Sequence, residues 1–218
     1  MRARFSVLIA AASALPDAIT AGVFLFAWLY PTWHPELPAM LMLVMLIEFL
    51  AVHSGGMLGA FALDRSKPAK TRLKAILGLS FFYGLFVFGF AMAFESLWPV
   101  WWLLWLIFTK VSLAIGPVAQ GKTATLMTTM WGISAAFYLL MVMVTTILPI
   151  PRLGIDYAAV RMMELPGEGL WVDEPWRVIA FGFLYFFALA VARYGLRRRL
   201  GSESTTRGAK MQGPPTQG

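Results

Sequence analysis

One apolar run, Leu37–Leu63 (LPAMLMLVMLIEFLAVHSGGMLGAFAL), is long enough to cross a bilayer as a helix, yet it carries Glu48 and His53. A spanning helix needs about 20 mostly apolar residues. An ionisable side chain at membrane depth is costly and rare, and it is a candidate for a functional site. The run therefore predicts a membrane helix in which Glu48 and His53 are unusual residues.

The whole chain has the composition of a membrane protein. Of its 218 residues, 59% are hydrophobic and 13% are charged, and the mean hydropathy is +0.71. Soluble domains contain about 45–50% apolar and about 25% charged residues. We therefore expect an all-α integral membrane protein, with one polytopic transmembrane domain over residues 1–200 and no sizeable soluble domain. The sequence has no cysteine, which excludes disulfides and thiolate metal sites.

A bundle of about six transmembrane helices accounts for the apolar runs. The predicted spans are about 5–30, 38–62, 75–94, 98–115, 124–147 and 178–194. The segment Asp156–Leu165 predicts a short interfacial helix with Asp156 as its N-cap. The polar segment 201–218 is rich in Gly, Ser, Thr and Pro, and it predicts a disordered cytoplasmic tail.

The positive charges fall mainly on one side of this arrangement. Loops on the cytoplasmic side of membranes carry an excess of Lys and Arg. We therefore expect both termini in the cytoplasm, and we expect the chain in the inner membrane of a bacterial cell. Of the 18 basic residues, fourteen are then cytoplasmic, namely Arg2, Arg4, Arg65, Lys67, Lys70, Arg72, Lys74, Lys122, Arg193, Arg197, Arg198, Arg199, Arg207 and Lys210. Three others, Arg152, Arg161 and Arg177, are external, and Lys110 lies within a span.

The first span has a second interpretation. Met1–Arg4 followed by FSVLIAAASA is similar to a secretory signal peptide, with Ala12–Ala14 as a candidate cleavage site. However, the apolar run resumes at Ala18 and continues to Tyr30, as a membrane span does. We therefore expect this segment to be retained as the first span.

Four ionisable residues inside the spans form the candidate polar site: Asp17, Glu48, Lys110 and His53. A helix rises about 1.5 Å per residue. This rise places Asp17, Glu48 and Lys110 near the middle of a hydrocarbon core about 30 Å thick. Such residues usually face protein or a water-filled cavity and mark ion or substrate paths. Their alternative role is purely structural, because buried polar side chains also hold membrane helices together.

Helical geometry separates the two ionisable residues of the second span. At about 100° per residue, Glu48 shares a face with Gly55 and Gly59, and His53 lies about 140° from it. Gly55 and Gly59 form a small-xxx-small pair, which predicts close helix packing on this face. Glu48 and His53 therefore cannot form one site on a single face.

The simplest electrostatic pairing joins Lys110 to Glu48 or to Asp17. The other acid would then be protonated or bound to His53, so that one of the two acids is a candidate proton carrier. Pro16 removes a helical hydrogen bond next to Asp17 and predicts a kink in the first span. Broken helices of this kind often line transport sites.

Two sequence patterns are similar to functional motifs, but we do not expect either of them to have the corresponding function here. Gly116–Thr123 (GPVAQGKT) matches the phosphate-loop pattern, but it joins two spans instead of following a strand, so we expect no nucleotide binding. We expect no metal, because no zinc-site spacing such as H-E-x-x-H occurs. We expect no nucleic-acid partner, because membrane topology accounts for the positive charge, and we expect no cofactor. Ser54 points about 100° away from His53, so these two do not form a nucleophile–base pair.

Two functions fit these residues. The first is a transporter or channel-like protein for a small solute or ion, with the midplane polar residues as its site. The second is a non-catalytic accessory or scaffold subunit held together by buried polar contacts. An intramembrane enzyme is a third reading, and no catalytic residue is marked by a motif. The expected partners are the lipid bilayer and either a second copy of the chain or another membrane protein.

Overall fold

The computed structural model describes residues 2–64, 66–115 and 122–211, and this part of the chain is all-helical. The all-α fold class predicted from the sequence is therefore confirmed. The elements are α1 (Arg2–Leu29), α2 (Leu37–Leu63), α3 (Ala69–Ala93), α4 (Trp98–Ile115), α5 (Lys122–Ile147), α6 (Tyr157–Met162), α7 (Leu170–Asp173) and α8 (Pro175–Met211).

Five stretches of the described helices are long and apolar enough to cross a membrane, which gives the chain the architecture of a multi-pass membrane protein. They are Ala10–Leu29, Leu37–Leu63, Ala69–Ala93, Thr128–Ile147 and Pro175–Arg198. The helix α4 has the predicted bounds but is not one of these five. Large apolar side chains are exposed on the outer faces of the helices, including Phe81 at 73% and Trp105 at 65%. Soluble monomers rarely expose extended apolar surfaces.

The short helix α6 begins where the sequence predicts it. The Asp156 carboxylate accepts a hydrogen bond of 2.8 Å from the backbone N–H of Ala159, so the predicted N-cap is confirmed. The helices α2 and α8 begin with a proline in their first turn, Pro38 and Pro175, where the missing N–H has no intrahelical partner in any case.

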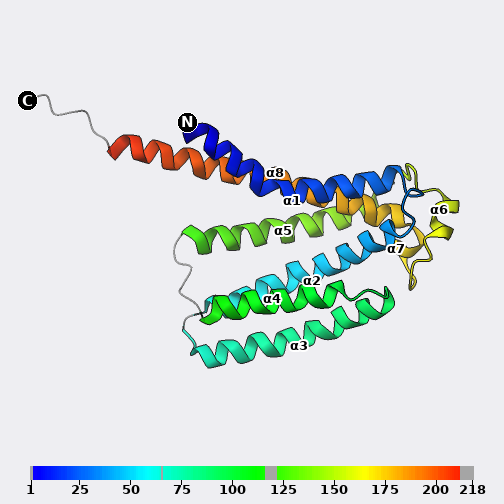
Figure 1. Ribbon diagram of the computed structural model, residues 1–218, viewed down its shortest axis with the longest axis horizontal. Coiled ribbons are helices and arrows are strands. Elements are labelled where there is room, and N and C mark those ends of the chain that lie inside the picture. Colours follow the sequence, from blue (N-terminus) through cyan, green and yellow to red (C-terminus); the bar gives the residue numbers. More distant parts are fainter. Residues whose placement is uncertain (1, 65, 116–121, 212–218) are drawn as a thin grey trace, which may run out of the picture.

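Two helices join the others into a bundle (Figure 1). The helix α8 packs lengthwise against α1 and also contacts α5 and α2. The helix α2 contacts α3 and α4, which pack against each other, and it also contacts α5. Thus α1, α5 and α8 form one half of the bundle, α3 and α4 form the other half, and α2 lies between them.

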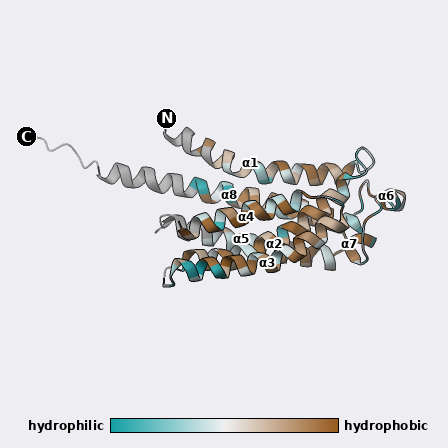
Figure 2. Ribbon diagram, turned by 60° about the horizontal axis from the view of Figure 1, so that its bottom comes forward, coloured by the Kyte–Doolittle hydropathy of each residue, from teal (hydrophilic) through white to brown (hydrophobic). Residues whose placement is uncertain are grey.

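The start of α1 and the end of α8 lie at the same end of the bundle, and α6 and α7 lie at the opposite end (Figure 1). Figure 2 shows hydrophilic residues at the start of α3 and in α8 before its terminal part, at the end that the termini share. The helix α8 continues to Met211, so its backbone remains helical beyond Leu200, where the sequence predicts the start of a disordered tail.

The close packing of α1 on α8 depends on the absence of a side chain at Gly182. A Cβ atom at Gly182 would collide with the ring of Phe24, which is fully buried. Around this contact, Ala21, Ala27, Phe181 and Tyr185 form part of the larger apolar core. Small residues allow membrane helices to approach closely and so to gain dispersion contacts.

Two arginines of the described chain cap the C-terminal ends of neighbouring helices. Arg72 of α3 is buried and donates a hydrogen bond of 2.7 Å to the carbonyl of Ala114 in the last turn of α4. Arg177 of α8 donates bonds of 2.8 and 3.0 Å to the carbonyls of Thr145 and Leu148 at the end of α5. A cation at a helix C-terminus satisfies unpaired carbonyls and interacts favourably with the helix dipole.

Replacing Gly182 by alanine is predicted to lower the free energy of unfolding by about 1–3 kcal/mol, the usual cost of overpacking. The added methyl group must displace the Phe24 ring and loosen α1 from α8. Denaturant-induced unfolding of the purified protein in detergent measures this change. The matched control is Gly195→Ala in the same helix, where a Cβ meets nothing within 4 Å. Equal stability of Gly182→Ala and Gly195→Ala would contradict this packing.

Candidate functional site

Asp17 of α1 forms an ion pair with Arg193 of α8. Asp17 Oδ2 lies 2.8 Å from Arg193 Nε, and the two side chains are 9% and 39% exposed, respectively. These two buried atoms form no aligned hydrogen bond, so the attraction between them is ionic. The helix α1 remains continuous through Pro16, and it presents Asp17 to α8 from the turn that follows this proline.

Glu48 of α2 is held by a tyrosine of the same helix α8. The fully buried hydroxyl group of Tyr185 donates a hydrogen bond of 2.6 Å to Glu48 Oε1. A second tyrosine, Tyr138 of α5, packs edge-on against Tyr185 at a centroid distance of 5.5 Å and donates a bond of 3.1 Å to the carbonyl of Met45. The two hydroxyls therefore connect α2 to both α5 and α8.

These contacts define a polar cluster of four residues: Asp17, Glu48, Tyr185 and Arg193. The charges of both Asp17 and Arg193 act electrostatically on the Glu48 carboxyl. Because the surroundings are largely apolar, charges interact here more strongly than they would in water. The cluster thus contains two carboxylates, one guanidinium and one hydroxyl donor between α1, α2 and α8.

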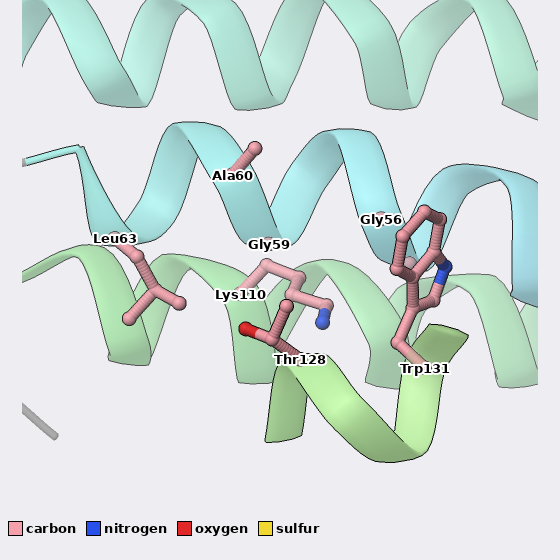
Figure 3. A pocket seen from close by; sticks show the side chains of 8 residues that line it. Gly56, Gly59, Ala60, Leu63, Lys110, Thr128 and Trp131 are labelled. Carbon is pink, nitrogen blue, oxygen red and sulfur yellow. The ribbon is translucent and has the colours of Figure 1, made fainter. Parts of the chain in front are cut away.

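Lys110 of α4 lies outside this cluster, in a cavity of about 350 Å³ between α2, α4 and α5 (Figure 3). We call this space the Lys110 cavity. The residues that define its shape are Gly55, Gly56, Gly59, Lys110, Thr128 and Trp131. A Cβ atom at Gly59 would lie 3.8 Å from the Lys110 ammonium, and one at Gly56 would collide with the Trp131 ring.

The predicted pairing of Lys110 with Glu48 or Asp17 is wrong. The structure pairs Asp17 with Arg193 and bonds Glu48 to Tyr185. The physical reason is which helices are neighbours in the bundle. The helix α8 packs on α1 and α2 and so brings its side chains to both acids, whereas α4 packs on α3 and α2. Gly55 and Gly59 face Trp131 and Lys110, so side chains of α5 and α4 cover this glycine face.

His53 occupies a different face of α2 from Glu48, as helical geometry predicts. Its exposed ring lies 5.6 Å from that of Phe49 and 6.4 Å from that of Tyr83 on α3. Glu48 instead bonds to α8. Among the residues that the structure describes, no three His, Asp or Glu side chains are grouped so that they could hold a metal ion. Residues 116–121, which contain most of the phosphate-loop pattern, lie outside the described residues.

Arg193 and Tyr185 are the cluster residues that sequence reasoning missed. Arg193 lies inside the predicted last span, but it was counted with the cytoplasmic charges that follow it in the sequence. A usable signal was the spacing of eight residues between Tyr185 and Arg193. This spacing places them about 80° apart on a helix, on the same side.

A double-mutant cycle on Asp17 and Arg193 tests the ion pair. Asp17→Asn and Arg193→Gln should each lower the free energy of unfolding. The double variant should lose less stability than the two single losses added together, with a coupling energy of about 0.5–3 kcal/mol. Unfolding in detergent is the readout. The comparison cycle uses Asp17→Asn with Lys110→Gln, whose effects should add because these residues do not meet. Coupling of Asp17 to Lys110 and additivity with Arg193 would contradict the pairing.

Comparison with known proteins assigns no family to the chain. No protein-family model, no curated protein and no solved structure matches it. The geometry of the polar cluster and of the Lys110 cavity is therefore the basis for a functional assignment.

Proposed function

We propose that this protein is a small membrane transporter or channel-like protein for a small solute or ion, and that the polar cluster is the site at which a proton or monovalent cation is bound and released. One observation carries the proposal. Two carboxylates lie inside a bundle of apolar helices, and the ion pair with Arg193 belongs to Asp17, whereas Glu48 has the neutral Tyr185 hydroxyl as its partner.

The charge balance of the cluster supports this role. When both acids are ionised, one negative charge is not compensated by Arg193. A net charge in an apolar interior is costly unless it is neutralised. A proton or a monovalent cation would neutralise it.

Glu48 is the carboxyl at which we place this exchange. Asp17 is in direct contact with the guanidinium, whereas Glu48 has a neutral hydroxyl as its hydrogen-bond partner. An acid paired with a cation favours its charged form, while a phenol hydroxyl can also bond to a protonated carboxyl. Tyr185 would therefore keep Glu48 in position while its charge changes.

The topology that we propose has six spans and both termini in the cytoplasm. The sixth span is α4, whose 18 residues would extend about 27 Å and contain one ionisable residue, Lys110. An even number of spans agrees with the position of the start of α1 and the end of α8 at one end of the bundle (Figure 1). The excess of basic residues in the sequence at that end supports the cytoplasmic orientation.

The second candidate, an accessory or scaffold subunit, is favoured by a different observation. Two tyrosine hydroxyls bond across helices, Tyr185 to Glu48 and Tyr138 to Met45, and such bonds hold membrane helices in register. On this reading, removal of the polar groups lowers stability and changes no flux.

Flux measurements on proteoliposomes distinguish the two functions. Purified protein is reconstituted with an internal pH dye, and proton, sodium and potassium gradients are imposed in turn. We expect the internal pH to change faster than in empty liposomes under at least one gradient. We expect Glu48→Gln to reduce this rate at least tenfold while the variant remains folded. This reduction follows because the amide can neither bind a proton nor compensate a cation.

The matched control is Glu36→Gln, which changes an exposed carboxylate at the start of α2. This variant should retain wild-type flux. Absence of flux from the wild-type protein under all three gradients would contradict the proposal, and so would wild-type flux in Glu48→Gln. A fall in stability of Glu48→Gln with no flux in any sample would instead support the scaffold function.

A further inference from the structure

The Lys110 cavity opens through the side wall of the bundle. The helices α4 and α5 both pack on α2 and make little contact with each other, so a space remains between them over α2. Gly55, Gly56 and Gly59 of α2 form the floor of this space and fill none of it with side chains. Trp131 on its rim is 43% exposed, so the cavity reaches the outer surface that lipid would cover.

The cavity has one charged group, and that group has no described counter-ion. The three ion pairs between described residues are Lys67–Asp64, Arg177–Glu174 and Arg193–Asp17. Lys110 is half-buried, and its ammonium lies over Gly59 at the centre of the cavity (Figure 3). A half-buried cation without a carboxylate makes the cavity complementary to an anion.

The position of Lys110 along α4 limits the kind of anion. It lies five residues before the end of this helix, which corresponds to about 8 Å, at the end of the bundle that both termini share. This position lies in the half of a core about 30 Å thick that is nearer to that end, and the long lysine side chain can extend its ammonium toward the headgroups there.

We propose that the Lys110 cavity binds an anionic phospholipid, with the lipid phosphate on the Lys110 ammonium and an acyl chain along the apolar wall between α4 and α5. Basic pockets between membrane helices are known to bind anionic headgroups in this manner. A soluble phosphate ester shares the phosphate but has no chain to cover the wall. This site is separate from the polar cluster and does not depend on the proposed transport.

Trp131 also fixes the shape of the cavity. Its indole N–H donates a hydrogen bond of 2.6 Å to the carbonyl of Val52, and its ring lies against Gly56. The ring is therefore anchored to α2 although it belongs to α5. This bridge closes one end of the cavity and leaves the side toward Lys110 and Leu63 for the ligand.

Native mass spectrometry of the full chain in a neutral detergent tests the proposal. Phosphatidylglycerol and phosphatidylcholine with identical acyl chains are titrated separately. We expect tighter binding of phosphatidylglycerol to the wild-type protein, and a loss of affinity of about tenfold in Lys110→Gln, the effect of removing one charged hydrogen bond. The matched control is Lys74→Gln, an exposed lysine at the same end of the bundle but outside the cavity, and it should bind as the wild type does.

A second variant tests the cavity without touching the charge. Gly59→Leu fills the floor, and the first added carbon lies at an ordinary contact distance of 3.8 Å from Lys110, so we expect the helix to fold and phosphatidylglycerol binding to fall. Glycerol phosphate should not displace the lipid at equal concentration. Lack of headgroup preference in the wild-type protein, unchanged binding in both variants, or displacement by glycerol phosphate would each overturn the proposal.

Discussion

The contact between α1 and α8 determines where the charges of this bundle meet. The two helices pack lengthwise because Gly182 leaves room for the Phe24 ring. Their close approach places Asp17 beside Arg193, and Arg193 would otherwise join the basic stretch at the end of the last span. In an apolar bundle a carboxylate at this depth requires a partner, so the packing of the apolar surfaces and the pairing of the charges depend on each other.

The helix α2 divides the polar residues between two sites. Near its middle, α2 presents Glu48 to Tyr185 of α8, and about two turns further along the helix Gly55, Gly56 and Gly59 face α4 and α5. The first site has an excess of negative charge, and the second has a single positive charge. Proton or cation exchange suits the first site, and retention of an anion suits the second. Because the same helix forms part of both, a shift of α2 would change both sites.

Local signals predicted most of the helices. Apolar run length predicted the six long helices of the described chain, and the Asp156 cap predicted the start of α6, because hydropathy and capping depend on near neighbours in sequence. The partners of Asp17 and Glu48 could not be predicted in this way, since helix order within a bundle is set by packing between segments far apart in sequence. Lys110 was assigned to the acids only because it was the basic residue nearest the middle of a span. Arg193 was overlooked because it adjoins a basic tail.

The central claim is that Glu48 exchanges a proton or cation while Tyr185 holds it in place. Infrared difference spectroscopy of the reconstituted protein tests it most directly, by recording the carbonyl stretch of protonated carboxyl groups as the pH is lowered. We predict a band that is absent in Glu48→Gln, shifted in Tyr185→Phe through loss of the hydrogen bond, and unchanged in Glu36→Gln. A carboxyl band that remains unaltered in Glu48→Gln and disappears in Asp17→Asn would contradict the claim, because Asp17 would then be the exchanging group.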